Sequence, residues 1–223
     1  METTKKLEIN NYTKVMLPAI NYDFASDSRL LIPFIEGDKI GFINKDGIVV
    51  VKPQYNMYHG ECYNSEDTIK VGVQYHRGYA RNNGKVEIYS RPLYGLINCE
   101  GELILPIEYL WIWPAIGNKN LFTVQRKDYS WGVITADGEE IVPFGKYEWI
   151  DGFDKGYARV KNGKQSSNLK DNDNKWGLIN EIGEEVLPAE YDSIWNFYNK
   201  DWDNTIIVKS AVSTKFFFNK RGL

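Results

Sequence analysis

His59 and Cys62 are the first residues whose types and spacing could do chemistry. They lie three positions apart, and a second histidine, His76, follows. A thiol–imidazole nucleophile needs its base within hydrogen-bond reach and a third group that orients the base. The sequence shows no such group, so we interpret these side chains as ordinary loop residues and predict no catalytic residue.

Acidic residues offer two further candidates. Residues 171–174 read Asp-Asn-Asp-Asn like the start of a calcium loop, but Trp176 and Ile182 occupy the positions that need Gly and Glu. Asp151 and Asp154 could flank a glycosidic bond across a cleft, but some close pair is expected among 30 acidic residues. We therefore predict no metal site, no cofactor and no enzymatic activity, with a carboxylate-pair hydrolase as the least favoured hypothesis.

Aromatic side chains carry more information, because the chain has seven Trp. Alternating segments place Trp111, Trp113, Trp149, Trp195 and Phe197 on one face of their predicted strands. Such rings can stack on sugars or anchor a protein partner. Their recurrence at matched positions favours packing between repeats, because every repeat must bury the same face.

Aromatic residues that do not recur are the better candidates for a binding site. One group lies at residues 198–203, beside two carboxylates, and the other lies near a long insertion. Exposed aromatic side chains rimmed by charge are common interface anchors. The predicted partner-binding residues are Tyr198, Trp202, Asp201, Asp203, Tyr89 and Tyr94.

The elements that must position these residues form a repeated unit. Its clearest copy runs from Trp176-Gly177 through Gly183 and Pro188 to Tyr191, and matching copies begin at Gly41, Gly95 and Gly132. Each copy predicts a short apolar strand, a turn ending in a Gly of positive φ, and a second strand. The Pro that follows belongs at an edge or a bulge, and the first Gly indicates close backbone approach. An alternating segment and a final strand complete the unit, and no segment predicts a helix.

The two ends of the chain match complementary halves of this unit. Residues 15–23 copy the second half, and residues 216–222 copy the first half. Together they would make a fifth unit. We predict an all-β domain of about five repeats over residues 15–223, after a polar lead at residues 1–14, closing into a propeller-like toroid. An open β-solenoid is the alternative.

Extra length falls near residues 61–67, 82–92 and 165–174. The last two insertions follow matching segments, Gly78-Tyr79-Ala80-Arg81 and Gly156-Tyr157-Ala158-Arg159. We therefore expect them at equivalent positions and on the same face, which is often the binding face of a repeat protein.

These motifs resemble the bacterial WG-repeat family. The likeness rests on Trp-Gly-hydrophobic-Ile-Asn, the Gly turn, Pro and Tyr-Asp at residues 176–192, and on Gly-Tyr-Ala-Arg-Val at residues 156–160. The sequence departs from the pattern where Ile40 and Tyr94 replace Trp, and near Phe217, where the Gly is missing. The resemblance implies a β-rich binding or scaffold role and supplies no catalytic residues. By analogy, small cytoplasmic bacterial repeat proteins can neutralise a toxin as immunity partners.

Composition indicates the class of partner and the compartment. The net charge is −3 without a long basic stripe, which disfavours nucleic acid. The polar first ten residues and the lack of about 18 consecutive apolar residues predict no signal peptide and no membrane partner. Two cysteines, Cys62 and Cys99, suggest a reducing cytoplasm. Our hypothesis is a cytoplasmic protein-binding module, acting as an immunity or inhibitor protein against a toxin or effector; the alternative is a carbohydrate-binding module using exposed aromatic side chains.

Overall fold

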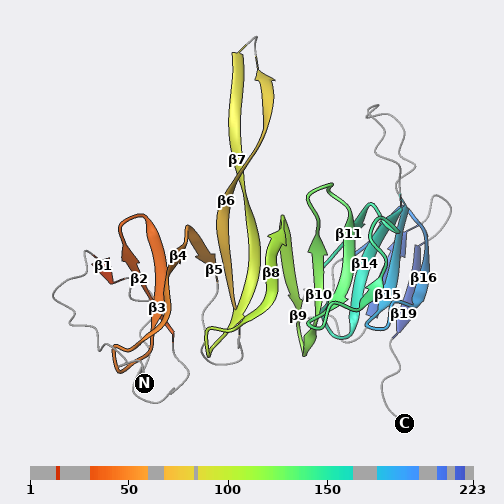
Figure 1. Cartoon of the computed structure of the whole chain (residues 1–223). Helices are drawn as coiled ribbons and strands as arrows, with labels where there is room; N and C mark the ends of the chain where they lie inside the picture. Colours follow the sequence, from red (N-terminus) through yellow and green to blue (C-terminus); the bar gives the residue numbers. More distant parts are fainter. Residues whose placement is uncertain are drawn as a thin grey trace. The chain divides into compact units, whose positions relative to one another are not determined.

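The structure is a computed structural model that describes residues 14–15, 31–59, 68–82, 85–162, 175–195, 205–209 and 214–218. Strands, turns and loops make up these ranges, with no helix among them (Figure 1). The pairings between their strands are all antiparallel. The predicted all-β class is therefore confirmed. The described part of the chain has no helix that is long and apolar enough to cross a membrane.

The chain forms two compact units, residues 1–110 and residues 111–223. Unit 1 contains two four-stranded sheets, in the orders β1-β2-β3-β4 and β5-β6-β7-β8. Their strands are β1 (Lys14–Val15), β2 (Ile32–Glu36), β3 (Lys39–Ile43), β4 (Val49–Tyr55), β5 (Met57–His59), β6 (Thr68–Asn82), β7 (Lys85–Asn98) and β8 (Leu103–Tyr109).

Unit 2 contains three sheets, in the orders β12-β11-β10-β9, β13-β14-β15-β16 and β17-β18-β19. Their strands are β9 (Trp111–Ala115), β10 (Asn118–Gln125), β11 (Trp131–Thr135), β12 (Glu140–Val142), β13 (Trp149–Ile150), β14 (Tyr157–Asn162), β15 (Lys175–Asn180), β16 (Glu185–Tyr191), β17 (Ser193–Ile194), β18 (Thr205–Lys209) and β19 (Thr214–Phe218).

The sheets are offset from the sequence repeat by half a unit. In the sheet β13-β14-β15-β16, the first two strands come from the copy that begins at Gly132 and the last two from the copy that begins at Gly177. The alternating segment that begins at Tyr191 is therefore divided between two sheets. Tyr191 is the last residue of β16, and after Asp192 the chain continues as β17 in the next sheet.

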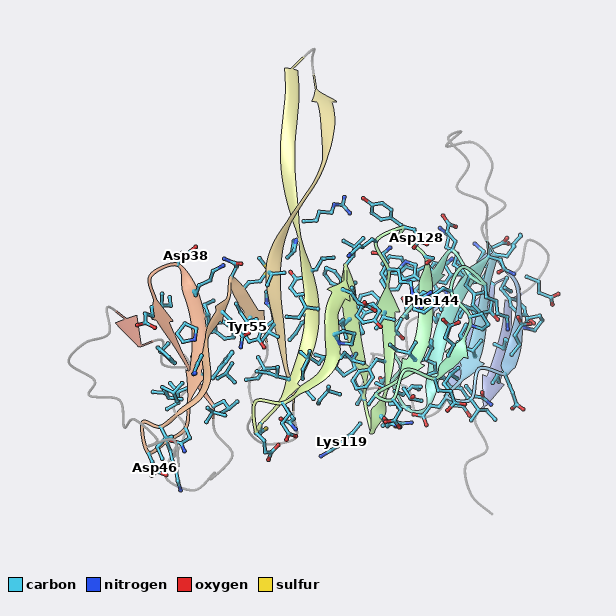
Figure 2. All side chains as sticks on the ribbon, viewed as in Figure 1. Asp38, Asp46, Tyr55, Lys119, Asp128 and Phe144 are labelled. Carbon is cyan, nitrogen blue, oxygen red and sulfur yellow. The ribbon has the colours of Figure 1, made fainter. Side chains whose placement is uncertain are left out.

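The hairpin turns are built as the repeat predicts. In the turn between β15 and β16, the Asn180 side-chain oxygen accepts hydrogen bonds from the backbone N–H groups of Ile182 (3.2 Å) and Glu184 (2.9 Å). Gly183 has the positive φ of 77° that the turn requires. Asn44 holds the β3–β4 turn in the same way, with the N–H of Asp46, labelled in Figure 2, at 3.0 Å.

The first Gly of the repeat permits a close approach between neighbouring strands, as predicted. In the β15–β16 pair, Trp176 lies opposite Tyr191 and Leu178 opposite Leu187, so Gly177 alone faces the bulge that contains Pro188. A Cβ at Gly177 would lie 2.8 Å from the Leu187 carbonyl oxygen. Because β16 is the last strand of its sheet, Pro188 sits both at an edge and at a bulge.

Each unit is held together by apolar side chains that pack between its successive sheets. In unit 1, a cluster includes Phe42, Val51 and Tyr55 of the first sheet and Val71 and Ile97 of the second. In unit 2, one cluster joins β11 to β14 and β15, and another joins β15 and β16 to Ile194 of β17. A sheet that is apolar on its inner face thus gains its core from the next sheet, as a repeat protein requires.

The two later insertions occupy equivalent places in their sheets. Both lie at the connection between the second and third strands, β6–β7 and β14–β15. Most of residues 82–92 belongs to the ends of β6 and β7. Residues 61–67 and 165–174 lie outside the described residues, and emergence on one face stays a prediction.

The terminal strands pair within their own units. Val15 of β1 pairs with Phe34 of β2, and β19 pairs with β18. The shared fifth unit, the domain limits and the choice between toroid and solenoid stay predictions.

Candidate functional site

Exposed tryptophans of unit 2 form the candidate site. Trp111 on β9 is 40% exposed, Trp149 on β13 is 37% exposed, and Trp195, directly after β17, is 60% exposed. Each lies on or beside the first strand of its sheet. We call Trp111, Trp113, Trp149 and Trp195 the tryptophan face. Clustered large apolar side chains at the surface are typical of interaction sites.

The prediction that these rings pack between repeats is confirmed for Trp113 and Trp149, whose rings meet between two sheets of unit 2, although Trp149 stays 37% exposed. Trp111 and Trp195 are more exposed than this prediction expects. The neighbouring side chains on the opposite side of each strand take the core positions: Ile112, Ile150 and Ile194 are 1%, 0% and 3% exposed. Successive strand residues point to opposite faces, so burying the isoleucines turns the tryptophans outward. Phe197, the remaining member of the predicted face, lies outside the described residues.

Trp113 is the centre of a continuous group of indole rings. It stacks on the buried Trp131 with ring centroids 5.2 Å apart and an interplanar angle of 14°. It meets Trp111 and Trp149 edge to face, each at 5.6 Å. Offset and edge-to-face aromatic pairs stabilise one another by about 0.5–1.5 kcal/mol. The exposed rings of Trp111 and Trp149 are therefore held in place by Trp113 when no ligand is bound.

Asp151 and Arg159 connect the tryptophan face to the next sheet. Asp151 accepts a hydrogen bond from the Trp149 indole N–H at 2.6 Å and forms an ion pair with Arg159. Arg159 also donates to the Ile194 carbonyl oxygen at 2.9 Å, next to Trp195. Its guanidinium lies 5.1 Å from the centre of the Trp176 ring. Arg159 thus links the Asp151 carboxylate, which binds the Trp149 indole, to the backbone next to Trp195.

Two further ion pairs among the described residues lie near Trp149 and Trp195 in the sequence. Lys161 lies 3.6 Å from Glu148, and Lys175 forms an ion pair with Asp192. Each pair joins a cation to a carboxylate of similar exposure. The described part of the face therefore combines exposed aromatic rings with three ion pairs.

The comparison with known protein families agrees with the repeat. The model of the WG containing repeat matches residues 40–60, 131–165 and 176–209. This chain contains WG repeats. The predicted resemblance is thereby confirmed. No curated protein and no solved structure matches the chain.

The structure also explains why the copy at Gly95 departs from the WG pattern without losing its fold. Tyr94 pairs with Tyr109, as Trp176 pairs with Tyr191 in a matched WG repeat. Tyr94 is 8% exposed, and the Lys70 ammonium lies 5.0 Å from the centre of its ring. Burial raises the pKa of Tyr94 and lowers the pKa of Lys70. Tyr94, predicted as a partner-binding residue, is thus a buried residue in the position of the repeat tryptophan.

The other predicted partner-binding residues are not placed by the structure. Tyr198, Asp201, Trp202 and Asp203 lie outside the described residues. Tyr89 belongs to β7, but its side chain is not among those described. The partner-binding role of these residues stays a prediction.

The structure shows which contacts the two acidic candidates, Asp151 and Asp154, make. Asp151 is committed to Trp149 and Arg159, and Asp154 exchanges backbone hydrogen bonds with Tyr157 at 3.0 Å. Among the described residues, no group of three or more His, Cys, Asp or Glu side chains could hold a metal ion. Residues 171–174 and Cys62 lie outside the described part of the chain.

Sequence reasoning missed Arg159 as part of the site. The signal was present, because Arg159 ends the Gly-Tyr-Ala-Arg segment that recurs at residues 78–81. Its partner Asp151 was considered only as half of a catalytic pair. Asp151 directly follows β13 and pairs with Arg159 of the neighbouring strand β14.

Proposed function

We propose that this WG-repeat chain is a non-enzymatic protein-binding module and that its partner binds the tryptophan face of unit 2. The observation that carries the proposal is the exposure of Trp111, Trp149 and Trp195, of which Trp111 and Trp149 contact the ring of Trp113. Tryptophan is enriched among the few interface residues that supply most of the binding energy. Rings that are already held in place lose little conformational entropy when a partner covers them.

The exposed area is large enough to matter for affinity. A tryptophan side chain presents roughly 250 Å², so covering the 60% of Trp195 that is exposed would remove about 150 Å² from water. At about 25 cal/mol per Å² this contributes an upper value of ~4 kcal/mol. Trp111 and Trp149 would each add ~2 kcal/mol by the same calculation. The net contribution of each is smaller, because binding also costs translational and side-chain freedom.

For the partner we propose a toxin or effector protein, which this chain would neutralise in the cytoplasm as an immunity or inhibitor protein. The support is the combination of WG repeats with an exposed aromatic surface and a net charge of −3. A negatively charged binder attracts a basic partner and raises the rate of encounter.

Carbohydrate binding is the second candidate, and the paired charges favour it. Asp151–Arg159, Glu148–Lys161 and Asp192–Lys175 leave a locally neutral aromatic surface, which suits an uncharged polyhydroxylated ligand. Such a ligand would lie on the indole rings and change their fluorescence. A panel of neutral glycans titrated against the chain, followed by tryptophan emission, separates this candidate from protein binding.

The experiment that tests the proposal is a capture comparison from a lysate of the source organism. Immobilised wild-type chain is compared with Trp195→Ala, Trp111→Ala and the control Ile182→Ala. Ile182 is 68% exposed on the turn between β15 and β16, so its truncation removes exposed apolar area outside the tryptophan face. We expect one protein in near-stoichiometric amount with wild type and control, and its loss with both tryptophan variants. Equal capture by all four chains would contradict the proposed site.

A further inference from the structure

The strands β6 and β7 form a two-stranded arm that extends beyond the rest of their sheet (Figure 1). Their pairing runs from Thr68–Asn98 at the base to Asn82–Lys85 near the tip. The neighbouring strands stop much earlier. β5 pairs only with residues 70–72 of β6, and β8 pairs only with residues 94–97 of β7. We call residues 74–82 of β6 and 85–90 of β7 the arm.

The fold itself does not need this arm. The equivalent hairpin in the first sheet, β2–β3, closes directly after Glu36–Lys39 through the two residues Gly37 and Asp38. A two-stranded ribbon without a third strand is marginally stable in water. The extra length adds ordered residues, and ordering each of them costs conformational entropy.

The charge of the arm is opposite to that of the rest of the chain. It carries three basic residues, Arg77, Arg81 and Lys85, and one acidic residue, Glu87, which gives a net charge of +2. Because the whole chain carries −3, the remainder carries −5. A basic element on an acidic protein favours an acidic ligand at that element.

The two long edges of the arm differ in regularity. The pairing shifts between His76 and Tyr79, so β6 contains a bulge at Arg77 and Gly78. Bulges are a common device that protects a strand edge from pairing with other chains. β7 has no such shift from Lys85 to Ser90, and among the described residues no strand pairs with its other edge over this range. The edge of β7 is therefore the one suited to an added strand.

We propose that the β7 edge of the arm takes up an extended acidic segment of a partner protein as an additional β-strand. Main-chain hydrogen bonds along residues 85–90 supply the affinity, and Arg77, Arg81 and Lys85 select carboxylate-bearing segments. The added strand converts the two-stranded ribbon into a three-stranded sheet, which stabilises it. This surface belongs to unit 1 and is distinct from the tryptophan face of unit 2.

The arm could serve two alternative roles, and each leads to a different prediction. Basic side chains on an edge can serve only to prevent pairing with other chains, and then no strand binds. Basic residues interleaved with Tyr75, Tyr79 and Tyr89 could instead bind single-stranded nucleic acid by stacking and charge. The acidic remainder of the chain disfavours nucleic acid, which is why we propose a peptide strand.

Fluorescence anisotropy with the full chain tests the proposal. The probe is a fluorescein-labelled alternating Glu–Val octapeptide. The comparison probes are the same peptide N-methylated at every residue, an alternating Lys–Val octapeptide, and a 20-nucleotide deoxythymidine strand. Two variants accompany wild type: R77E/R81E/K85E, and a chain in which residues 74–92 are replaced by Asn-Gly, which joins the paired residues Val73 and Leu93 through a hairpin turn. Thermal unfolding of each variant shows that the fold is kept.

We expect saturable binding of the Glu–Val peptide to wild type, at least ~10-fold weaker binding to the charge variant, and loss with the shortened chain. This tenfold change corresponds to ~1.4 kcal/mol. The N-methylated peptide cannot form the strand hydrogen bonds and should also bind at least ~10-fold more weakly. Equal affinity for the N-methylated peptide would overturn strand addition. Binding of the deoxythymidine strand in place of the peptide, or no binding at all, would overturn the proposal as well.

Discussion

The close approach at Gly177 leads to a specific prediction for Gly177→Ala. An added Cβ would lie 2.8 Å from both the Leu187 carbonyl oxygen and the Ala189 nitrogen, and 2.9 Å from the Ala189 Cα. All three atoms are backbone, so no side-chain rotation can relieve the contact. Restoring ordinary contact of 3.4 Å requires β16 to move by about 0.6 Å. Gly177 is not among the glycines with positive φ, so the cost is steric.

The size of the effect follows from two opposing contributions. Overpacking a tight site typically costs about 1–3 kcal/mol, and three close backbone atoms of β16 place this position near the upper value. Replacing Gly by Ala also reduces the conformational entropy of the unfolded chain, which stabilises the folded state by about 0.4–1 kcal/mol. We therefore expect a net loss of ~2 kcal/mol in the free energy of unfolding. For a chain of this size the melting temperature should fall by roughly 4–8 °C.

Gly152→Ala is the matched control within the same unit. The nearest atom to its added Cβ is the Trp113 Cβ at 3.4 Å, which is ordinary contact. This variant should be neutral or up to ~1 kcal/mol more stable than wild type. Urea and thermal unfolding, followed by circular dichroism, compare both variants with wild type. If Gly177→Ala were no less stable than Gly152→Ala, the close approach would not explain the repeat glycine.

Two further predictions concern the turns and the contacts between sheets. Asn180→Ala should lower the free energy of unfolding by ~1–2 kcal/mol in urea, because the Ile182 and Glu184 N–H groups lose their side-chain acceptor. Glu184→Ala removes only the bond that the Asn180 amide donates to the Glu184 carboxylate, so it should lose less, and equal losses would contradict this role. Burial and the 2.6 Å hydrogen bond that its hydroxyl donates to Glu185 raise the pKa of Tyr147. The folded chain thus holds this proton more tightly than the unfolded chain, whose tyrosine pKa is about 10, so the stabilisation is complete below pH 10 and is lost as the pH rises further. Tyr147→Phe should therefore lower the free energy of unfolding by ~1 kcal/mol at pH 7. In urea titrations above pH 10, this variant should lose less stability with rising pH than wild type does. An unchanged alkaline profile would contradict the role of the Tyr147 proton.

The repeat could be predicted because its residues have local physical reasons. A Gly with positive φ and an Asn with a free side-chain acceptor define the hairpin turn without reference to the rest of the fold. Pro188 restricts its position to an edge or a bulge by lacking a donor, and it lies at both. These features act over a few residues, which is why they can be read from the sequence.

The orientation of the aromatic face could not be predicted in this way. Both faces of the segment around Trp111 are apolar, so alternation separates two faces without saying which one is buried. The isoleucines occupy the core positions, and Trp111, Trp149 and Trp195 stay partly exposed. The alternation also continues across Asp192, so it could not show that the chain changes sheet there.

The length of the arm was likewise hidden from the sequence. The insertion at residues 82–92 was located by comparing repeats, but an insertion can be a loop or an extension of both strands. The register of β6 and β7 decides for the extension, because Tyr79 pairs with Ile88 and Arg81 with Val86. Such pairing depends on residues of two strands together, which the pattern of either strand alone does not determine.

Protein binding at the tryptophan face is tested most directly by the affinity for the captured partner. Isothermal titration calorimetry would compare wild type, Trp195→Ala and Ile182→Ala against that purified partner. We predict that Trp195→Ala weakens binding by more than ~10-fold, which is at least ~1.4 kcal/mol, while Ile182→Ala binds as wild type does. Unchanged affinity of Trp195→Ala and Trp111→Ala, with both variants folded, would contradict the proposed binding face.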